Sequence, residues 1–205
     1  MQTGMFRMML QKTAVCRDSR APVRRKAGQS PHNPQVPTVS GFDWTGWDGE
    51  VKATLLFVVR GAEILLIEKK RGHGAGKVNG PGGKIDPGES PLECAVRETE
   101  EELHISVRDA RKVGELWFQM SDYPSILCHV FIGSDFTGTP TETDEAVPLW
   151  MPLDAIPYDR MWEDDRHWLP LVLGGRSILG KFVFDGESMV SKEIAERDFP
   201  AAQPE

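Results

Sequence analysis

Apolar residues in this chain occur in short runs, and the spacing within each run indicates strands or helices. Residues 54–59 and 64–67 form two apolar, partly β-branched runs, and the segment Arg60 to Glu63 between them is typical of a hairpin turn. Further strands are predicted at 112–120, 126–132, 147–151 and 181–185, and short helical segments at 153–156 and 168–173. This mixed order predicts an α/β or α+β sandwich.

A longer helix is predicted after two glycine-rich stretches at 72–76 and 79–83. Ser90 stands at the N-cap position, Pro91 at the first helical position, and Glu93 completes a capping-box pattern. At about 100° per residue, one stripe of this helix is apolar: Leu92, Ala95, Val96, Thr99 and Leu103. We therefore expect that side of the helix to pack against the rest of the protein.

A different face of the same helix carries Glu98, Glu101 and Glu102. Like charges at this spacing repel and destabilise a helix by roughly 0.2–0.5 kcal/mol per pair, so a bound cation is the natural compensation. Carboxylate oxygens are hard ligands, which favour Mg²⁺ or Mn²⁺ over zinc. For the helix taken alone, a solvated acidic face remains the alternative.

Composition and charge restrict the class of protein. The chain has 205 residues, 40% of them hydrophobic, and a net charge of −7, which is unsuited to a protein that tracks a nucleic acid polymer. No apolar run approaches the roughly 18–20 residues needed to span a bilayer, so we expect no membrane partner. Cys16, Cys94 and Cys128 are widely separated, as expected for reduced thiols in a cytoplasmic protein, which we expect to be a monomer.

The first 48 residues are rich in Arg, Lys, Pro, Ser and Gln and show no strand or helix periodicity. We interpret residues 1–48 as a disordered basic extension, with an organelle transit peptide or a later start of translation as alternatives. One domain at residues 49–194 and a flexible tail at 195–205 complete the predicted organisation.

The acidic helix belongs to a longer pattern. Gly83, Glu89, Arg97, Glu98, Glu101, Glu102 and Ile105 stand at the spacing G-x5-E-x7-R-E-U-x-E-E-x-G-U, where U is a bulky apolar residue. This pattern resembles the signature of the Nudix hydrolase superfamily. The resemblance implies an α/β/α sandwich with a mixed β-sheet and metal-dependent hydrolysis of a diphosphate.

The resemblance also implies roles for individual residues. Glu98, Glu101 and Glu102 would coordinate divalent cations, together with a backbone carbonyl at Gly82 or Gly83. Arg97 and Glu89 would form a supporting ion pair. Glu145 would join the metal site or act as a base, and an ordinary acidic turn residue is the alternative interpretation.

Two positions depart from the Nudix pattern. Thr99 replaces a bulky aliphatic residue, but its methyl group can still face the core. His104 replaces a glycine that normally ends the helix in a left-handed conformation, which histidine adopts at some cost. Neither change removes a candidate metal ligand.

Segments outside the acidic helix resemble one subfamily, the oxidised purine nucleoside triphosphate hydrolases of animals. The resemblance is carried by residues 69–84 and by Met161 to Asp165. It implies that Trp162 stacks on a purine and that Asp164 and Asp165 hydrogen-bond to its polar edge. Asn79, Lys69 and His73 would complete the substrate contacts, although His73, Val78 and Pro81 depart from the subfamily and put its base preference in doubt.

The leading hypothesis is therefore a Nudix diphosphatase that converts oxidised purine nucleoside triphosphates (8-oxo-dGTP, 2-hydroxy-dATP) to monophosphate and pyrophosphate in nucleotide-pool sanitation and DNA repair. Mg²⁺ is the expected cofactor, with Mn²⁺ possible. The alternatives are a Nudix hydrolase for another nucleoside diphosphate derivative and a non-catalytic nucleotide-binding regulator.

Overall fold

The computed structural model describes residues 36–200, and residues 1–35 and 201–205, which include Cys16, lie outside that range. The helices are η1 (Val39–Gly41), α1 (Pro91–Leu103), η2 (Tyr158–Arg160) and α2 (Asp165–Leu173). The strands are β1 (Val51–Arg60), β2 (Glu63–Lys69), β3 (Val78–Asn79), β4 (Ile105–Val107), β5 (Arg111–Met120), β6 (Ile126–Gly133), β7 (Phe136–Gly138), β8 (Ala146–Pro152), β9 (Ile178–Asp185) and β10 (Ser188–Glu196). Between residues 36 and 200, no helix has the length and apolar character required to cross a bilayer.

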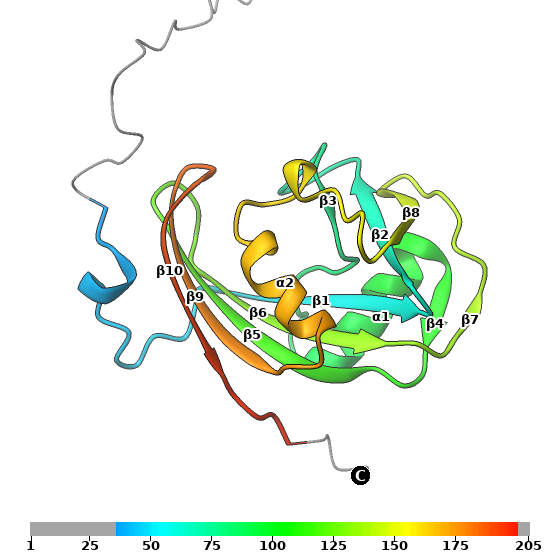
Figure 1. Cartoon of the computed structure of the whole chain (residues 1–205), viewed down its shortest axis with the longest axis horizontal. Helices are drawn as coiled ribbons and strands as arrows, with labels where there is room; N and C mark the ends of the chain where they lie inside the picture. The colour runs from blue at the N-terminus through cyan, green and yellow to red at the C-terminus, as the bar shows by residue number, and fades with distance from the viewer. Residues whose placement is uncertain (1–35, 201–205) are drawn as a thin grey trace, which may run out of the picture. The chain divides into compact units, whose positions relative to one another are not determined.

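One mixed sheet forms the centre of the domain (Figure 1). Its strand order is β10-β9-β5-β6-β1-β2-β3, and β8 also pairs with β2. The pairs β1–β6 and β5–β9 are parallel, whereas β1–β2, β5–β6, β2–β8 and β9–β10 are antiparallel. The predicted hairpin is confirmed, because Arg60 pairs with Glu63 across a two-residue turn.

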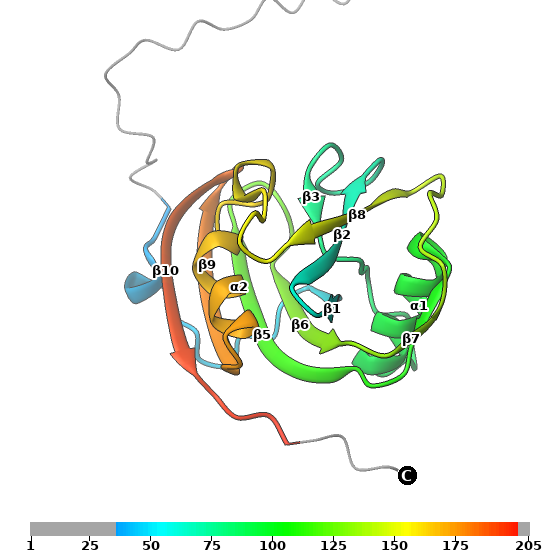
Figure 2. The same ribbon diagram turned by 45° about the vertical axis from the view of Figure 1, so that its right-hand side comes forward.

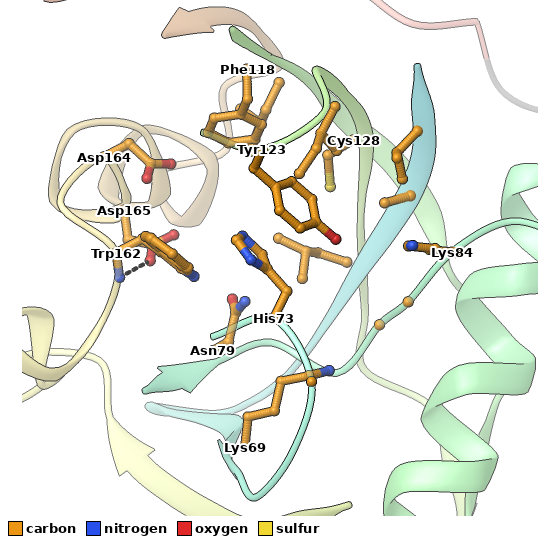
Figure 3. Close-up of a pocket in the computed structure, with 18 of the residues that line it drawn as sticks. Lys69, His73, Asn79, Lys84, Phe118, Tyr123, Cys128, Trp162, Asp164 and Asp165 are labelled. Atoms are coloured by element: carbon orange, nitrogen blue, oxygen red, sulfur yellow. Dashed lines mark hydrogen bonds between the residues drawn. The ribbon is translucent and has the colours of Figure 1, made fainter. Parts of the chain in front are cut away.

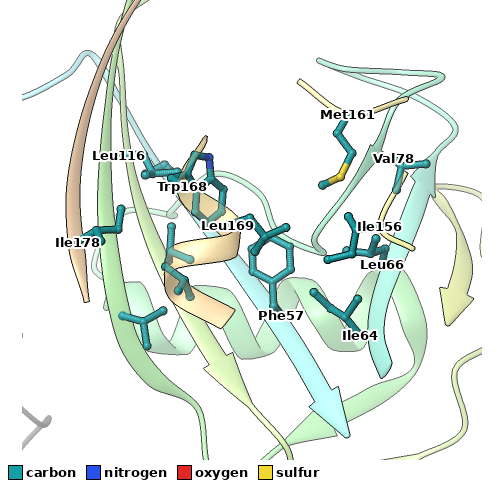
Figure 4. Close-up of a cluster of buried hydrophobic side chains, with 14 of the residues drawn as sticks. Phe57, Ile64, Leu66, Val78, Leu116, Ile156, Met161, Trp168, Leu169 and Ile178 are labelled. Carbon is teal, nitrogen blue, oxygen red and sulfur yellow. The ribbon is translucent and has the colours of Figure 1, made fainter. Parts of the chain in front are cut away.

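The two faces of the sheet are covered by different helices. Alternation along β1 sends Phe57 into a core with α2, where its ring meets Trp168 edge-on with centroids 5.8 Å apart (Figure 4). Leu56 and Val58 point the other way and pack with Leu103 of α1. Figure 2 shows α1 and α2 separated by the sheet. The predicted α/β sandwich with a mixed sheet is therefore confirmed.

One predicted helix is wrong. Residues 153–156 form a turn, in which the Leu153 backbone N–H donates to Ala62 and that of Ala155 donates to Pro152. Proline brackets this segment at Pro152 and Pro157, and a residue before proline is sterically disfavoured from helical geometry. The 3₁₀ turn η2 begins only after the second proline.

The last strand, β10, was not predicted because its sequence is largely polar and exposed. It pairs antiparallel with β9 along its whole length, from the Ser188–Asp185 pair to the Glu196–Ile178 pair, with one register shift. As the edge strand it buries few side chains, so its sequence lacks the apolar alternation of an inner strand.

Residues 38–49, which we call the aromatic arm, are packed on the sheet, unlike the disordered extension predicted for residues 1–48. Val39 is buried, and its N–H donates to Ser191 Oγ of β10 at 2.7 Å. Trp47 stacks on Trp117 of β5, with ring centroids 4.9 Å apart and 22° between the planes. Trp47 Nε1 also donates to Gln119 Oε1 at 3.3 Å. Aromatic residues dispersed among Gly, Asp and Thr thus attach the arm to the sheet without any periodic pattern that the sequence could reveal.

Candidate functional site

The glycine-rich loop before α1 lies against the sheet and against the acidic helix. At Gly82, which has φ of 153°, an added Cβ would lie 2.0 Å from the Thr54 carbonyl oxygen. At Gly83, an added Cβ would lie 2.3 Å from the carboxyl carbon of Glu98. The Gly83 carbonyl accepts from the Thr54 N–H at 2.9 Å. No such bond to the Gly82 carbonyl is found within residues 36–200, which makes Gly82 the carbonyl available for a ligand.

Helix α1 has the ends that the sequence predicts. Ser90 Oγ accepts from the Glu93 N–H at 3.3 Å, and Glu93 Oε2 accepts from the Ser90 N–H at 2.8 Å, which completes the capping box. At the other end His104 is left-handed, with φ of 58°, and its N–H donates to the Glu100 carbonyl. His104 Nδ1 lies 2.7 Å from Thr141 Oγ1. This hydrogen bond helps to hold histidine in a conformation that favours glycine.

Arg97 binds three carboxylates around the start of the acidic cluster. Its Nε and Nη2 donate to the two oxygens of Glu89 at 2.7 and 3.0 Å, which confirms the expected ion pair. Its Nη1 donates to Glu98 at 2.9 Å and to Glu101 at 3.1 Å. The hydrogen bonds from Arg97 lower the pKa of Glu89 to about 2.

The three acids of the predicted metal face occupy three different environments. Glu101 is exposed and Glu98 is half-buried, with its pKa raised by that burial. Glu102 is only 1% exposed, so the prediction that all three acids face away from the packed side is wrong for this residue. The cause is tertiary packing, because Lys69 Nζ of β2 and the Gly82 N–H of the glycine-rich loop donate to its carboxylate at 3.1 and 2.9 Å. Burial raises the pKa of Glu102, and the charge of Lys69 opposes that rise.

A cavity of about 620 Å³ extends from the glycine-rich loop to α2 (Figure 3). One end, the glycine-loop end, is lined by Lys69, Arg71, Gly82, Gly83, Lys84, Glu98 and Glu145. The other, the aromatic end, is lined by His73, Asn79, Tyr123, Trp162, Asp164 and Asp165, with Phe118, Cys128 and Trp168 beneath them. The cavity thus joins residues that the sequence places in separate segments.

Asp164 and Asp165 are 2% and 3% exposed. Asp164 Oδ2 accepts from Trp168 Nε1 at 2.9 Å, and Asp165 Oδ2 accepts from the Trp162 N–H at 3.0 Å. Burial raises the pKa of Asp164 to about 6, and burial together with the charge of Asp164 raises the pKa of Asp165. The pair therefore retains a proton at a higher pH than exposed aspartates do, so it can both donate and accept hydrogen bonds.

Two aromatic residues line the mouth of the aromatic end beside the expected stacking residue. His73 stacks on Trp162 with ring centroids 4.9 Å apart, and on Tyr123 with centroids 4.3 Å apart. Lys77 Nζ lies 4.6 Å from the Trp162 ring centroid. The Asn79 side-chain oxygen accepts from the Gly80 N–H at 2.8 Å, which leaves its NH₂ group as a donor at the cavity wall.

Glu145 shares the cavity with Glu98 but is paired with Arg71. Among residues 36–200, no three His, Cys, Asp or Glu side chains stand close enough together to hold a metal ion. The carboxylates of the three helix acids contact cationic side chains instead. Arg97 contacts Glu98 and Glu101, and Lys69 contacts Glu102. The available metal ligands are carboxylate and carbonyl oxygens, which suit a hard divalent cation once the metal replaces Arg97 and Lys69 as the partner of these carboxylates.

Several cavity residues were not predicted. Phe118 and Leu116 reach it from β5, and the period-two alternation of that strand could have indicated them. Lys84 follows the glycine-rich loop directly and could have been proposed as a phosphate contact. Tyr123 lies in the turn between β5 and β6, where no local signal distinguishes a cavity residue from a solvent-exposed one.

Comparison with known proteins places this geometry in a family. The model of the NUDIX domain matches residues 50–172. Oxidized purine nucleoside triphosphate hydrolases of Mus musculus and Danio rerio are each 40% identical to this chain, over 71% and 67% of this chain and 94% and 88% of their own lengths. A MutT protein from Bacillus halodurans superimposes with a TM-score of 0.64 at 25% identity, over 70% of this chain and 97% of that protein. Since the domain match spans more than half of the chain and contains the acidic helix and its glycine-rich loop, the chain belongs to the Nudix hydrolase family.

Proposed function

We propose that this protein hydrolyses oxidised purine nucleoside triphosphates to the monophosphate and pyrophosphate. The observation that carries the proposal is the single cavity, which joins Glu98 and Gly82 at one end to Trp162 and the buried Asp164–Asp165 pair at the other. A nucleotide has the same two parts, a charged phosphate chain and a flat base. Relatives named for this activity align with the present chain over most of their length.

The glycine-loop end supplies groups for the phosphates. Nudix hydrolases generally use divalent metals, and a bound Mg²⁺ would neutralise phosphate charge and lower the pKa of the attacking water. Glu98, Glu101 and Glu102 would hold the metal together with the Gly82 carbonyl. Lys84, which lines the same end, offers an ammonium group to phosphate oxygens.

Glu145 is proposed as a further acid at this end, either in the metal site or as the base that takes a proton from water. Its position in the cavity with Glu98 supports the assignment. The ion pair with Arg71 must open for either role, since a paired carboxylate is a weaker base and ligand. Arg71 would then be free to contact the phosphate chain.

The aromatic end supplies groups for the base. Trp162 offers a large flat face, and Asn79 offers amide donors. The raised pKa values of Asp164 and Asp165 allow one carboxyl to donate while the other accepts. Oxidation changes which purine edge atoms donate and accept, so such a pair can distinguish a damaged base from a normal one.

Only one of the three departures from the subfamily lies in the cavity. Val78 of β3 is fully buried in the core that contains α2. Neither Val78 nor the buried Pro81 lines the cavity. His73 does line it. Any difference in base preference between this protein and its relatives is therefore proposed to arise from His73.

A substrate panel tests the proposal. Purified protein with Mg²⁺ is incubated with 8-oxo-dGTP, 2-hydroxy-dATP, dGTP and dATP, and the release of pyrophosphate is measured. We expect kcat/KM for at least one damaged nucleotide to exceed that for its normal counterpart by about tenfold or more, the scale of one discriminating buried hydrogen bond. Equal kcat/KM values for all four nucleotides would refute a role in nucleotide-pool sanitation, but the protein would still be a Nudix hydrolase.

The same panel includes ADP-ribose and a dinucleoside polyphosphate, which represent the alternative Nudix substrates. Preferential hydrolysis of either would replace the proposed substrate class. Binding of nucleotide without release of any product, under Mg²⁺ or Mn²⁺, would instead favour the non-catalytic regulator.

The cellular setting follows from the proposed substrate. We propose a cytoplasmic monomer that acts on the free nucleotide pool, which links it indirectly to DNA repair. The net charge of −7 supports a small nucleotide over a nucleic acid polymer as its partner. Cys94 and Cys128 are buried free thiols, as expected for a reducing compartment.

A further inference from the structure

Three aromatic rings form a continuous stack at the mouth of the aromatic end. His73 lies between Trp162 and Tyr123 (Figure 3). Its imidazole makes an angle of 22° with the Trp162 ring and 21° with the Tyr123 ring, so each outer ring stacks on one face of the imidazole. The three residues come from three segments: the glycine-rich loop, the loop before α2 and the β5–β6 turn.

The middle ring belongs to the most exposed of the three residues. His73 is exposed to solvent and makes no hydrogen bond to any other residue within 36–200. Its neighbours Gly72 and Gly74 have φ of 75° and 82°, so the loop bends at glycines on both sides of it. Stacking alone therefore holds the imidazole, and the side chain can leave without breaking a polar contact.

The outer ring, by contrast, stands on a fixed turn. Glu50 of the segment after the aromatic arm accepts from the Ser125 N–H at 3.0 Å, on the β6 side of the turn. On the β5 side, Ser121 Oγ donates to Asp185 at 2.9 Å and accepts from the Gly186 N–H at 3.1 Å. Tyr123 lies between these two anchored serines, so the backbone that carries its ring is held in place before any ligand binds.

The spacing of the stack matches a planar ligand. Centroid distances of 4.9 and 4.3 Å on the two sides of the imidazole leave room between Trp162 and Tyr123 for one flat ring. The five-membered ring of a purine is itself an imidazole. A base that replaced His73 would therefore contact the same two faces, and its six-membered ring would extend the contact.

We propose that the substrate base takes the place of the His73 imidazole, so that Tyr123 is a second stacking partner opposite Trp162. His73 then covers the Trp162 ring only until substrate binds. This assignment rests on the proposed function, because it requires a purine substrate. It makes Tyr123 a specificity-determining residue that favours bases with a large flat surface.

Steady-state kinetics of single variants test the proposal with the best nucleotide of the panel. For Tyr123→Ala we expect KM to rise about 5- to 10-fold with kcat within about 2-fold, the scale of one lost base-stacking contact. Tyr123→Phe keeps the ring and should restore the wild-type KM. Asp122→Asn, in the same turn, is the control for changes in the turn itself. For His73→Ala we expect KM to fall by about 2- to 5-fold, because nothing then competes with the base.

Each part of the proposal has its own contrary outcome. A wild-type KM in Tyr123→Ala would overturn the stacking role, and a raised KM in His73→Ala would show that the imidazole contacts the base instead of giving way to it. In both cases the wild-type enzyme still hydrolyses purine triphosphates, so the proposed function stands. A wild-type enzyme that hydrolyses no nucleotide of the panel would refute the proposed function itself.

Discussion

The two ends of the cavity keep charged groups in place by different means. At the glycine-loop end each of the three helix acids contacts a cationic side chain, which is Arg97 of the same helix for Glu98 and Glu101 and Lys69 of β2 for Glu102. At the aromatic end Asp164 and Asp165 are buried without a salt bridge to any other residue within 36–200. At the aromatic end a bound proton, and not a cationic side chain, therefore neutralises the carboxylate charge.

This difference separates chemistry from recognition. Carboxylates that are paired with cationic side chains at the glycine-loop end suit a site that must bind a divalent cation. Carboxyls that keep a proton near neutral pH suit a site that must tell hydrogen-bond donors from acceptors on a base. If this division holds, changes at one end alter turnover, and changes at the other alter the choice of substrate.

The largest effect is expected from the glycine-loop end. Glu102→Gln keeps the shape of the side chain and removes its charge, so we expect kcat to fall by at least about 100-fold. Glu100→Gln, on the exposed face of the same helix, serves as the matched control and should keep wild-type turnover. A loss of nucleotide selectivity in Glu102→Gln, with turnover preserved, would contradict the division between the two ends.

The pH dependence of stability should have opposite signs at Glu89, which is paired with Arg97 beside the glycine-loop end, and at Asp164. The pKa of Glu89 is lowered to about 2, so its stabilising contribution is present above the ordinary pKa of 4.5 and is lost as pH falls towards 2. The pKa of Asp164 is raised to about 6, so the folded state binds the proton more tightly, and stability falls as pH rises from about 4 through 6.

Thermal unfolding between pH 2 and pH 8 tests these signs. Glu89→Gln should be less stable than wild type above pH 4.5 and should approach it towards pH 2. Asp164→Asn keeps an acceptor for Trp168 and should be more stable than wild type above pH 6, by ~2 kcal/mol, with the difference vanishing below pH 4. If Glu89→Gln and Asp164→Asn shifted stability in the same direction at neutral pH, the predicted difference in sign between the two carboxyl groups would be wrong.

The next effect in size is expected on the selectivity for damaged over normal nucleotides. In Asp164→Asn the side chain can no longer exchange a proton, so we expect the preference for the damaged nucleotide over the normal one to fall about 10-fold, with kcat for the normal nucleotide nearly unchanged. The measurement is the ratio of kcat/KM values for the pair of nucleotides. An equal fall for both nucleotides would mean that Asp164 supports catalysis and not recognition.

The smallest effect is expected at the contact between the aromatic arm and β5. Trp47→Phe keeps a ring against Trp117 but loses the hydrogen bond to Gln119, which costs about 0.5–1.5 kcal/mol of stability. Because the contact lies on the opposite side of β5 from the cavity, KM should stay within about 2-fold of wild type. A larger change in KM would show that the aromatic arm contributes to substrate binding.

The sequence predicts the glycine-loop end better than the aromatic end, and the reason is the distance between contacting residues. Local spacing indicates the helix cap, and the Nudix pattern implies the left-handed His104 and the Arg97–Glu89 pair, all of which depend on residues within about four helical turns. The burial of Glu102 escaped prediction because Lys69, which covers it, comes from β2.

At the aromatic end the motif Trp162 to Asp165 could be identified by resemblance, but its neighbours could not. Tyr123 reaches His73 only because β5, β6 and the glycine-rich loop meet in the folded sheet. Contacts of this kind depend on strand order and register, which a single sequence leaves open. The same limitation hid the aromatic arm, whose role depends on Trp117 far along the chain.

The aromatic arm has a consequence for where this protein can be cut. The matched family domain starts at residue 50, just after the arm, yet Trp47 covers the indole of Trp117 on β5. A chain trimmed to the family boundary would expose that indole on an open sheet face, the kind of apolar surface that promotes self-association. Shrinking either the Trp47 or the Trp117 ring would for the same reason reduce the cover of the other, with Trp44 as a remaining aromatic neighbour of both. The matched domain is thus shorter than the folded unit, which includes residues 38–49.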